Sequence, residues 1–312
     1  MAKPQTRAGD YSVKYDQDSD FLIWIEAFLM DRKAQRVATG TIKFYKNQLK
    51  RLVEYCDSQA ITQITQFDGN ALRGFILWLD ERGNNPGGQH AAYRTVRTFL
   101  RWWADETLPE GWRDPTRRVK PPRVGTQPLD PVSLQDVKAL IDACSKDTWF
   151  GDRDRAIFYT LIDTGIRANE LLSTDLQDYN PITGEMLIRQ GKGRKPRTVY
   201  LEHKARQAVR VYLRSREGNH PALWLKQFGG RLQYSGLRQM VRRRSMDAGI
   251  PEPPIHAFRR AFALTMLRNG VDVFTIQRLM GHADLSVLRR YLAQTGEDLK
   301  AAHHKASPAE ML

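Results

Sequence analysis

The sequence predicts a mainly α-helical protein that has one small antiparallel β-sheet and divides into two domains. Apolar residues recur at helical spacing over most of the 312 residues. One pair of short segments, 185–190 and 196–201, flanks a glycine-rich turn and indicates a β-hairpin. A proline-rich stretch at 112–131 separates two halves, each long enough to bury a core.

The first half contains four predicted helices after a polar segment, 1–17, that we expect to be flexible. They span 21–33, 41–56, 71–82 and 90–106, and together they define a predicted domain over 18–111. Leu49 and Leu52 lie on the predicted buried face of the second helix, as Val96 and Phe99 do in the fourth.

The opposite faces of two of these helices are basic. The second helix carries Lys43, Lys46 and Lys50, and the fourth carries Arg94, Arg97 and Arg101. One such face usually does no more than meet solvent, but two of the same sign make DNA binding an equally good explanation. The net charge of +14 also indicates a polyanionic partner, with nucleic acid ahead of an anionic membrane.

Other features narrow the class of protein. The longest apolar run, 21–30, contains Glu26 and is about half as long as a membrane-spanning helix, so we expect no membrane. The N-terminus lacks the apolar segment of a secretory signal. Cys56 and Cys144 are too few for a disulfide framework or a cysteine-based zinc site. The sequence thus predicts a cytoplasmic nucleic-acid-binding protein.

The stretch 112–131 holds five prolines and five Arg or Lys residues, and it predicts a basic linker between the domains. The second domain is predicted over 132–295, with Ser133 as the N-cap of its first helix. Predicted helices continue through Leu172 and, after the hairpin, recur near 204–216, 235–248, 257–269 and 272–280, then around Tyr291. A tail, 296–312, follows.

Four short patterns in the second domain hold candidate functional residues. His256 and Arg259 follow two prolines, so both cations lie in the first turn of a helix, where they oppose the helix dipole unless an anion binds. Arg167 and Glu170 stand where another helix begins, although such a pair alone is more often a surface ion pair. Lys192 lies between two glycines at the hairpin tip, although such a segment alone is more often a plain turn with solvated lysines.

The fourth pattern is the segment 279–292, LMGHADLSVLRRYL. It places His282 nine positions before Tyr291 and surrounds that tyrosine with Arg289 and Arg290. The simplest explanation is a helix break at Gly281 followed by a helix with an ordinary tyrosine. The alternative is a nucleophilic tyrosine beside a phosphate-binding site.

Together and in this order, the patterns TG-x-R-x-x-E-L, GKG-x-K-x-R, His-x-x-Arg, GH and Tyr resemble the tyrosine recombinases, the phage-integrase and Xer family. The resemblance covers about 133–295. It implies a C-terminal tyrosine-recombinase catalytic domain, and the four-helix half is similar to the family's core-binding (SAM-like) domain. The two domains are then expected to form a clamp on opposite faces of duplex DNA.

The resemblance also implies the roles of the site residues. Arg167 and Arg259 would clamp the non-bridging oxygens of the scissile phosphate, because guanidiniums are planar, bidentate and permanently charged. His282 would donate a hydrogen bond, and His256 would position the phosphate or assist proton transfer, with Glu170 in support. Tyr291 would form a 3′-phosphotyrosyl link. The general acid would be Lys192, with Lys195 on the same hairpin as the alternative. No metal or nucleotide cofactor is then required.

The expected partner is double-stranded DNA with short inverted repeats. The candidate DNA-binding residues are Lys43, Lys46, Lys50, Arg94, Arg97, Arg101, Arg117, Arg118, Lys120, Arg242 and Arg243. We expect a monomer in isolation and a tetramer in the synaptic complex, with the tail 296–312 docking on a neighbouring subunit. Two alternatives share the fold: a type IB topoisomerase that relaxes supercoils, and a DNA-binding regulator without catalytic activity.

Overall fold

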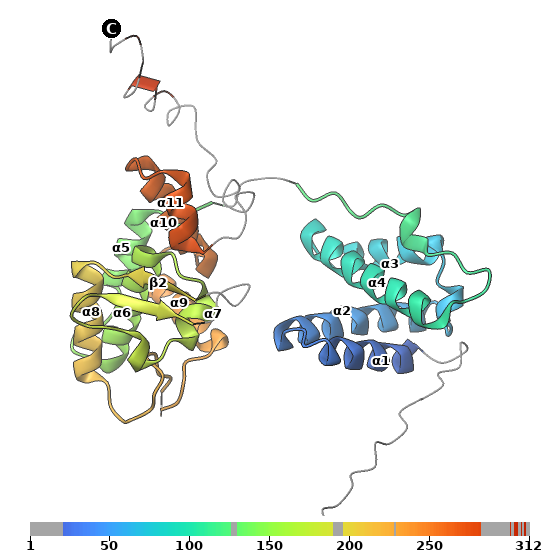
Figure 1. The fold of residues 1–312 in the computed structure, drawn as a ribbon, viewed down its shortest axis with the longest axis horizontal. Coiled ribbons are helices and arrows are strands. Elements are labelled where there is room, and N and C mark those ends of the chain that lie inside the picture. The colour runs from blue at the N-terminus through green and yellow to red at the C-terminus, as the bar shows by residue number, and fades with distance from the viewer. Residues whose placement is uncertain are drawn as a thin grey trace, which may run out of the picture. The chain divides into compact units, whose positions relative to one another are not determined.

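The computed structural model describes residues 21–125, 130–189, 196–227, 229–281 and five single positions between 300 and 309. The chain forms two compact units, Met1–Thr126 and Gln127–Leu312. Helices make up most of each unit, and the sheet in the described residues has two strands (Figure 1). The predicted fold class is confirmed. The division between the units falls inside the stretch predicted as a linker.

The first unit contains four helices, and two of them begin at strong sequence signals. They are α1 (Phe21–Ala34), α2 (Thr39–Ser58), α3 (Gly69–Glu81) and α4 (Pro86–Thr107). The Asp68 carboxylate caps α3 by accepting from the backbone N–H of Asn70 and Ala71 at 2.8 and 2.9 Å. The Asn85 side chain caps α4, and Pro86 fills its first position, where no N–H donor is needed.

The core of this unit is rich in aromatic side chains, to which all four helices contribute. Phe28 of α1 packs edge-on against Phe99 of α4 with ring centroids 5.7 Å apart, and both are fully buried. Tyr45 of α2 lies 5.4 Å from Phe28 on another side. These contacts hold α1, α2 and α4 together and leave their polar faces in solvent.

The segment after α4 packs onto the same core. The Tyr93 hydroxyl donates to the Val119 carbonyl at 2.6 Å, and Val119 is buried. Trp112 packs edge-on against Trp103 at 5.1 Å. A short 3-10 turn, Pro115–Arg117, lies between them. Residues 112–119, the first part of the proline-rich stretch predicted as a linker, therefore belong to the first unit, because their apolar side chains pack in its core.

The second unit is built around one long buried helix. Its helices are α5 (Leu134–Asp142), α6 (Trp149–Thr164), α7 (Ala168–Ser173), α8 (His203–Ser215), α9 (Tyr234–Asp247), α10 (Ile255–Arg268) and α11 (Val273–Met280). Helix α6 contacts α5, α8 and α10. The predicted N-cap of α5 is confirmed, since the Ser133 hydroxyl accepts from the backbone N–H of Asp136 at 2.9 Å.

The predicted hairpin is present as strands β1 (Glu185–Ile188) and β2 (Arg197–Tyr200), paired antiparallel with Ile188 opposite Arg197. Met186 and Ile188 are buried and alternate with exposed Glu185 and Leu187, so one face of the hairpin covers the core. The turn that joins the strands, 190–195, lies outside the described residues.

A buried charge network ties α6 to α9. Asp154 is fully buried, and its two carboxylate oxygens accept from Arg153 at 2.6 Å and from Arg244 at 2.8 Å. Arg153 also donates to the Leu225 carbonyl at 2.9 Å. Because each buried charge has a partner, the desolvation cost is offset, but loss of one partner would leave the others uncompensated.

Candidate active site

Arg167 stands at the start of α7, where a sharp turn redirects the chain. Helix α6 ends at Gly165, which is left-handed at φ 58°, and a Cβ there would lie 2.5 Å from the Phe262 ring. A glycine is required at this position. Glu170 then accepts from the Arg167 backbone N–H at 3.1 Å and from Arg167 Nη1 at 2.8 Å. Because Arg167 donates both of these bonds to one carboxylate, the conformation of its side chain is fixed.

Glu170 has a second guanidinium partner that the sequence analysis did not select. Arg197, at the start of β2, donates through Nη1 and Nη2 to the two oxygens of Glu170 at 3.0 and 2.7 Å. Glu170 is nearly inaccessible to solvent. Burial alone would raise its pKa, but Arg197 and then Arg167 outweigh that effect and hold the pKa at about 2. Glu170 is thus an anion between two cations.

His256 lies in the first turn of α10, as predicted, and Arg259, predicted in the same turn, lies at the start of the second. Arg259 is 2% exposed and donates to the Gly165 carbonyl at 2.5 Å and the Met280 carbonyl at 2.6 Å. His256 is exposed. Partial desolvation of the imidazole and the charges of Arg259, Arg260 and Arg167 lower its pKa. The neutral ring is therefore favoured near neutral pH, and it can accept a proton.

Three arginines converge on the end of α11. The carbonyls of Leu279, Met280 and Gly281 accept from Arg197, Arg259 and Arg167 at 3.3, 2.6 and 3.1 Å, respectively. A helix leaves its last carbonyls without intrahelical donors, so the arginines satisfy them. Gly281 ends the helix at φ 62°, and His282 follows it directly.

The structure thus brings Arg167, Glu170, Arg259 and the residue before His282 together, with His256 within electrostatic reach of both arginines. Lys192, Lys195, His282 and Tyr291 lie outside the described residues, as do Arg289 and Arg290. Their predicted roles stay predictions. The motif GKG-x-K-x-R did contain Arg197, but nothing in its spacing indicates a contact with Glu170.

The predicted DNA-binding residues are all exposed. Two of them have an acidic neighbour: Lys50 lies 3.8 Å from Glu54, and Arg101 lies 3.6 Å from Asp114. Arg242 and Arg243 are exposed on α9, directly before the buried Arg244.

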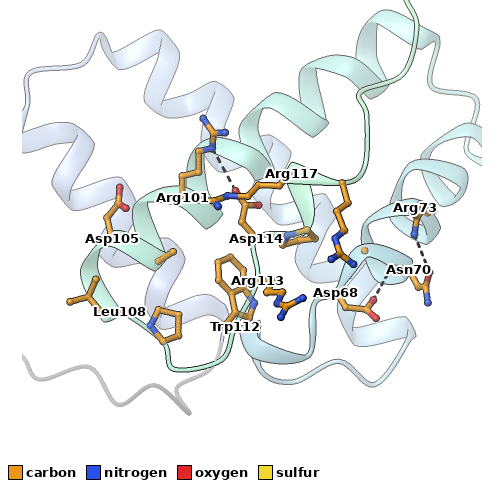
Figure 2. Close-up of a pocket in the computed structure, with 15 residues that line it drawn as sticks. Asp68, Asn70, Arg73, Arg101, Asp105, Leu108, Trp112, Arg113, Asp114 and Arg117 are labelled. Carbon is orange, nitrogen blue, oxygen red and sulfur yellow. Dashed lines mark hydrogen bonds and ion pairs between the residues drawn. The ribbon is translucent and has the colours of Figure 1, made fainter.

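A hollow of about 1150 Å³ lies in the first unit between the end of α4, the start of α3 and residues 112–118. It gathers Arg101, Arg117 and Arg118 with two arginines that the sequence analysis missed, Arg73 and Arg113. Figure 2 shows Arg101 joined to Asp114 beside this hollow, with Arg113 and Arg73 farther along it. Arg73 and Arg113 belong to no periodic basic face, so only the fold places them here.

Among the residues that the structure describes, no cluster of three or more His, Cys, Asp or Glu side chains could hold a metal ion. None of the helices in the same residues combines the length and apolar character needed to cross a membrane.

Comparison with known proteins gives one family and many relatives. The sequence model of the phage integrase family matches residues 132–297. Tyrosine recombinase XerD of Caulobacter vibrioides is 31% identical over 291 residues, which cover 88% of this chain and 93% of the relative. Tyrosine recombinase XerA of Pyrococcus furiosus is 32% identical over 291 residues, covering 92% and 95%.

Solved structures show the same fold at lower sequence identity. XerH recombinase bound to a palindromic difH substrate, in a post-cleavage complex, is similar with a TM-score of 0.73 and 19% identity, covering 95% of this chain and 97% of that one. The Tn1549 transposon integrase in complex with a circular intermediate DNA also gives 0.73, at 15% identity, covering 92% and 99%.

Proposed function

Because this chain belongs to the phage integrase family and is a site-specific DNA recombinase, we propose that it breaks and rejoins duplex DNA through a 3′-phosphotyrosyl intermediate. The Tyr291 oxygen attacks the scissile phosphorus, the bond to the 5′-oxygen breaks, and that oxygen takes a proton from Lys192. Rejoining reverses each step, so the energy of the phosphodiester is conserved and no nucleotide cofactor is consumed.

The observation that carries this proposal is the convergence of Arg167 and Arg259 on the turn that leads to His282. The transition state adds negative charge to the non-bridging oxygens, and fixed guanidiniums stabilise it without reorganising. Within the described part of the chain, the Arg167 guanidinium donates through Nη1 to Glu170 and through Nη2 to Gly281, and its remaining N–H groups give it capacity for an anion. This charge supply is the reason that we propose a metal-free reaction.

His256 fits a role in proton transfer. Its lowered pKa keeps the imidazole neutral near pH 7, where it can accept the phenolic proton as Tyr291 attacks. Arg167 and Arg259, which contribute to lowering its pKa, are also the arginines proposed to hold the phosphate, so the same positive charge would favour the tyrosinate.

We assign DNA binding to the basic faces of α2 and α4 together with the arginine-lined hollow of the first unit. Arg101 belongs to both, so the basic face of α4 runs into the hollow. Phosphates along a duplex are the anions that such a row of exposed cations fits. The contact with DNA would continue along the chain through Arg117, Arg118 and Lys120, which precede the second unit in the sequence.

The partner that we propose is a duplex with short inverted repeats, bound by two subunits, with two duplexes joined in a tetramer. Recombination exchanges four strands and so needs four active sites. The tail 296–312 is proposed to dock on the neighbouring subunit, a head-to-tail contact that closes into a ring. Action on DNA also agrees with a cytoplasmic location, which we retain as part of the proposal.

The test is covalent trapping on a nicked suicide duplex that carries the recombination site. The wild-type protein should form an SDS-resistant adduct in excess EDTA, whereas Tyr291→Phe should bind the duplex and form none. Tyr200→Phe, at an exposed tyrosine of β2, is the matched control and should form the adduct. An adduct with Tyr291→Phe, or one that requires added Mg²⁺, would contradict the proposal.

The general acid can be assigned with the same substrate. A 5′-bridging phosphorothioate has a leaving group that needs no proton. It should restore cleavage by Lys192→Ala and leave Lys195→Ala unaffected. Rescue of Lys195→Ala alone would transfer the role to Lys195.

A further inference from the structure

We propose that Arg197 is a positioning residue of this active site: it holds Glu170 so that Arg167 keeps both its orientation and its positive charge for the phosphate. The inference rests on the proposed function of Arg167. It concerns a side chain that touches Glu170 and the end of α11 but need not touch DNA.

The contacts of Arg197 span three elements of the second unit. Its side chain is 11% exposed and starts on β2. Two nitrogens bond Glu170 of α7, and Nε donates to the Leu279 carbonyl of α11 at 3.3 Å. Because the fork of a guanidinium is planar and rigid, these bonds fix β2, α7 and α11 relative to one another.

Arg197 shares each oxygen of Glu170 with Arg167. Oε1 accepts from Arg167 Nη1 and Arg197 Nη1, and Oε2 accepts from the Arg167 backbone N–H and Arg197 Nη2. Without Arg197, nothing in this set would stop the carboxylate from turning to face Arg167 alone. One buried anion would then pair with one cation and cancel the charge that the phosphate requires.

The net charge of the three side chains also indicates that Arg197 preserves the positive charge of Arg167. Glu170, Arg167 and Arg197 carry a net charge of +1, and replacing Arg197 by a neutral side chain leaves 0. Glu170 is 4% exposed, so water screens this change poorly. Arg197 is thus positioned to preserve the electrostatic strength of Arg167 as well as its geometry.

Packing at the end of α11 adds a second constraint. A Cβ at Gly281 would lie 2.8 Å from Arg197 Cδ and 2.9 Å from its Nε, so the guanidinium is packed directly against this turn. Arg167 and Arg259 bind the adjacent carbonyls. Arg197 therefore also restrains the backbone that leads into His282.

The fold offers a matched control at the other end of α7. Arg231 donates to the Leu172 carbonyl at 2.9 Å and to the Thr174 carbonyl at 3.3 Å, and it forms an ion pair with Asp175. Arg231, like Arg197, is an arginine bonded to backbone carbonyl oxygen and to a carboxylate, but it makes no bond to Glu170. Arg231→Gln should therefore leave the chemistry unchanged if α7 stays folded.

The experiment measures the rate of adduct formation on the suicide duplex, the single-site affinity and the thermal midpoint for Arg197→Gln, Arg197→Lys and Arg231→Gln. Arg197→Gln should lower the rate by about 10- to 100-fold, with affinity little changed. Arg197→Lys, which keeps the charge without the fork, should fall between it and wild type. Arg231→Gln should react at the wild-type rate.

The decisive readout is the double variant Glu170→Gln/Arg197→Gln. If Glu170 cancels Arg167 once Arg197 is replaced, removing the Glu170 charge should restore part of the rate. A merely structural role for Arg197 predicts a further loss instead, together with a parallel fall in thermal midpoint. A wild-type rate for Arg197→Gln, or no rescue in the double variant, would overturn the inference.

These outcomes are separable from a failure of the proposed function. If wild-type protein forms no adduct that depends on Tyr291, the phosphotyrosyl mechanism itself is wrong. If that adduct forms and Arg197→Gln makes it as fast as wild type does, only the role of Arg197 is refuted. Should Arg197→Gln fail to fold, Arg197→Met, a neutral side chain of similar length, is measured alone and with Glu170→Gln in its place, and Arg197→Lys separately tests the loss of the fork.

Discussion

In the first unit the basic side chains of α2 and α4 lie in solvent, whereas the arginines around α7, α10 and α11 in the second unit are largely buried and bonded to specific acceptors. Lys50 is 77% exposed, and its acidic neighbour is 3.8 Å away. Arg259 is 2% exposed and holds two backbone carbonyls at 2.5 and 2.6 Å.

This difference separates two uses of positive charge. Exposed cations attract a polyanion from a distance, act additively and weaken with salt. Buried, bonded cations hold a fixed geometry, which is worth more to a transition state than to a ground state. We therefore expect changes in the first unit to alter affinity, and changes around α7, α10 and α11 to alter the rate of chemistry.

The largest effect is expected from Arg259→Lys. Lysine keeps the charge, but a single ammonium cannot reproduce the planar fork that holds the Gly165 and Met280 carbonyls. The rate of adduct formation should fall on the order of 10²- to 10³-fold, as for removal of a transition-state donor. Single-turnover kinetics on the suicide duplex measure this rate. The control is Arg210→Lys, at an exposed position of α8, which should react at the wild-type rate. A wild-type rate for Arg259→Lys would contradict the expectation that the buried arginines of the second unit determine the rate of chemistry.

The next effect is on stability. Asp154→Asn leaves Arg153 and Arg244 buried against a neutral amide, and it should lower the free energy of unfolding by about 3–5 kcal/mol. Asp142→Asn removes the carboxylate of an ion pair with Lys138 whose side chains are 60% and 78% exposed, and it should leave the free energy of unfolding nearly unchanged. Urea denaturation compares them. Equal decreases in the free energy of unfolding would mean that burial does not determine how much these ion pairs contribute to stability.

The same contrast between local pattern and tertiary contact explains what the sequence could predict. The helices of both units and the hairpin follow from periodicity and caps, such as Ser133 before α5 and Asn85 before α4. These signals lie within a few residues of the elements that they define. Arg167, Glu170, His256 and Arg259 were selected by motif, and the structure brings them together.

Interactions between distant segments were not predictable in this way. Arg197 and Glu170 are 27 residues apart, and Arg244 and Asp154 are 90 apart, so no local spacing links either pair. The basic hollow has the same origin, because Arg73 and Arg113 come from different segments. Within the stretch predicted as a linker, Trp112 and Val119 pack on the first core, and proline content alone does not indicate that contact.

A smaller effect is expected when the exposed cations are removed in groups. The triple alanine variants at Lys43, Lys46 and Lys50 and at Arg94, Arg97 and Arg101 should reduce the slope of log affinity against log salt by about 0.9 for each phosphate that the protein no longer neutralises. Adduct formation at saturating protein should be unchanged. Fluorescence anisotropy over a salt series gives the slope. If slope and affinity both match wild type, these faces meet only solvent.

The smallest effect concerns Arg101, the one residue of its basic face for which the described structure gives an acidic partner. The two oxygens of Asp114 have separate partners: Oδ1 accepts from the Thr116 backbone N–H at 2.8 Å, and Oδ2 lies 3.6 Å from Arg101. Asp114→Asn keeps the first interaction and removes the charge from the second. Arg101 would then be available to phosphate, so affinity for the site should rise about two- to fivefold at low salt.

In the wild-type background, Arg101→Ala should weaken binding less than Arg97→Ala, because Asp114 already offsets part of the charge of Arg101. Anisotropy titrations of the three variants decide it. Equal decreases in affinity for the two arginine variants, with no gain for Asp114→Asn, would mean that the ion pair opens freely whenever DNA binds.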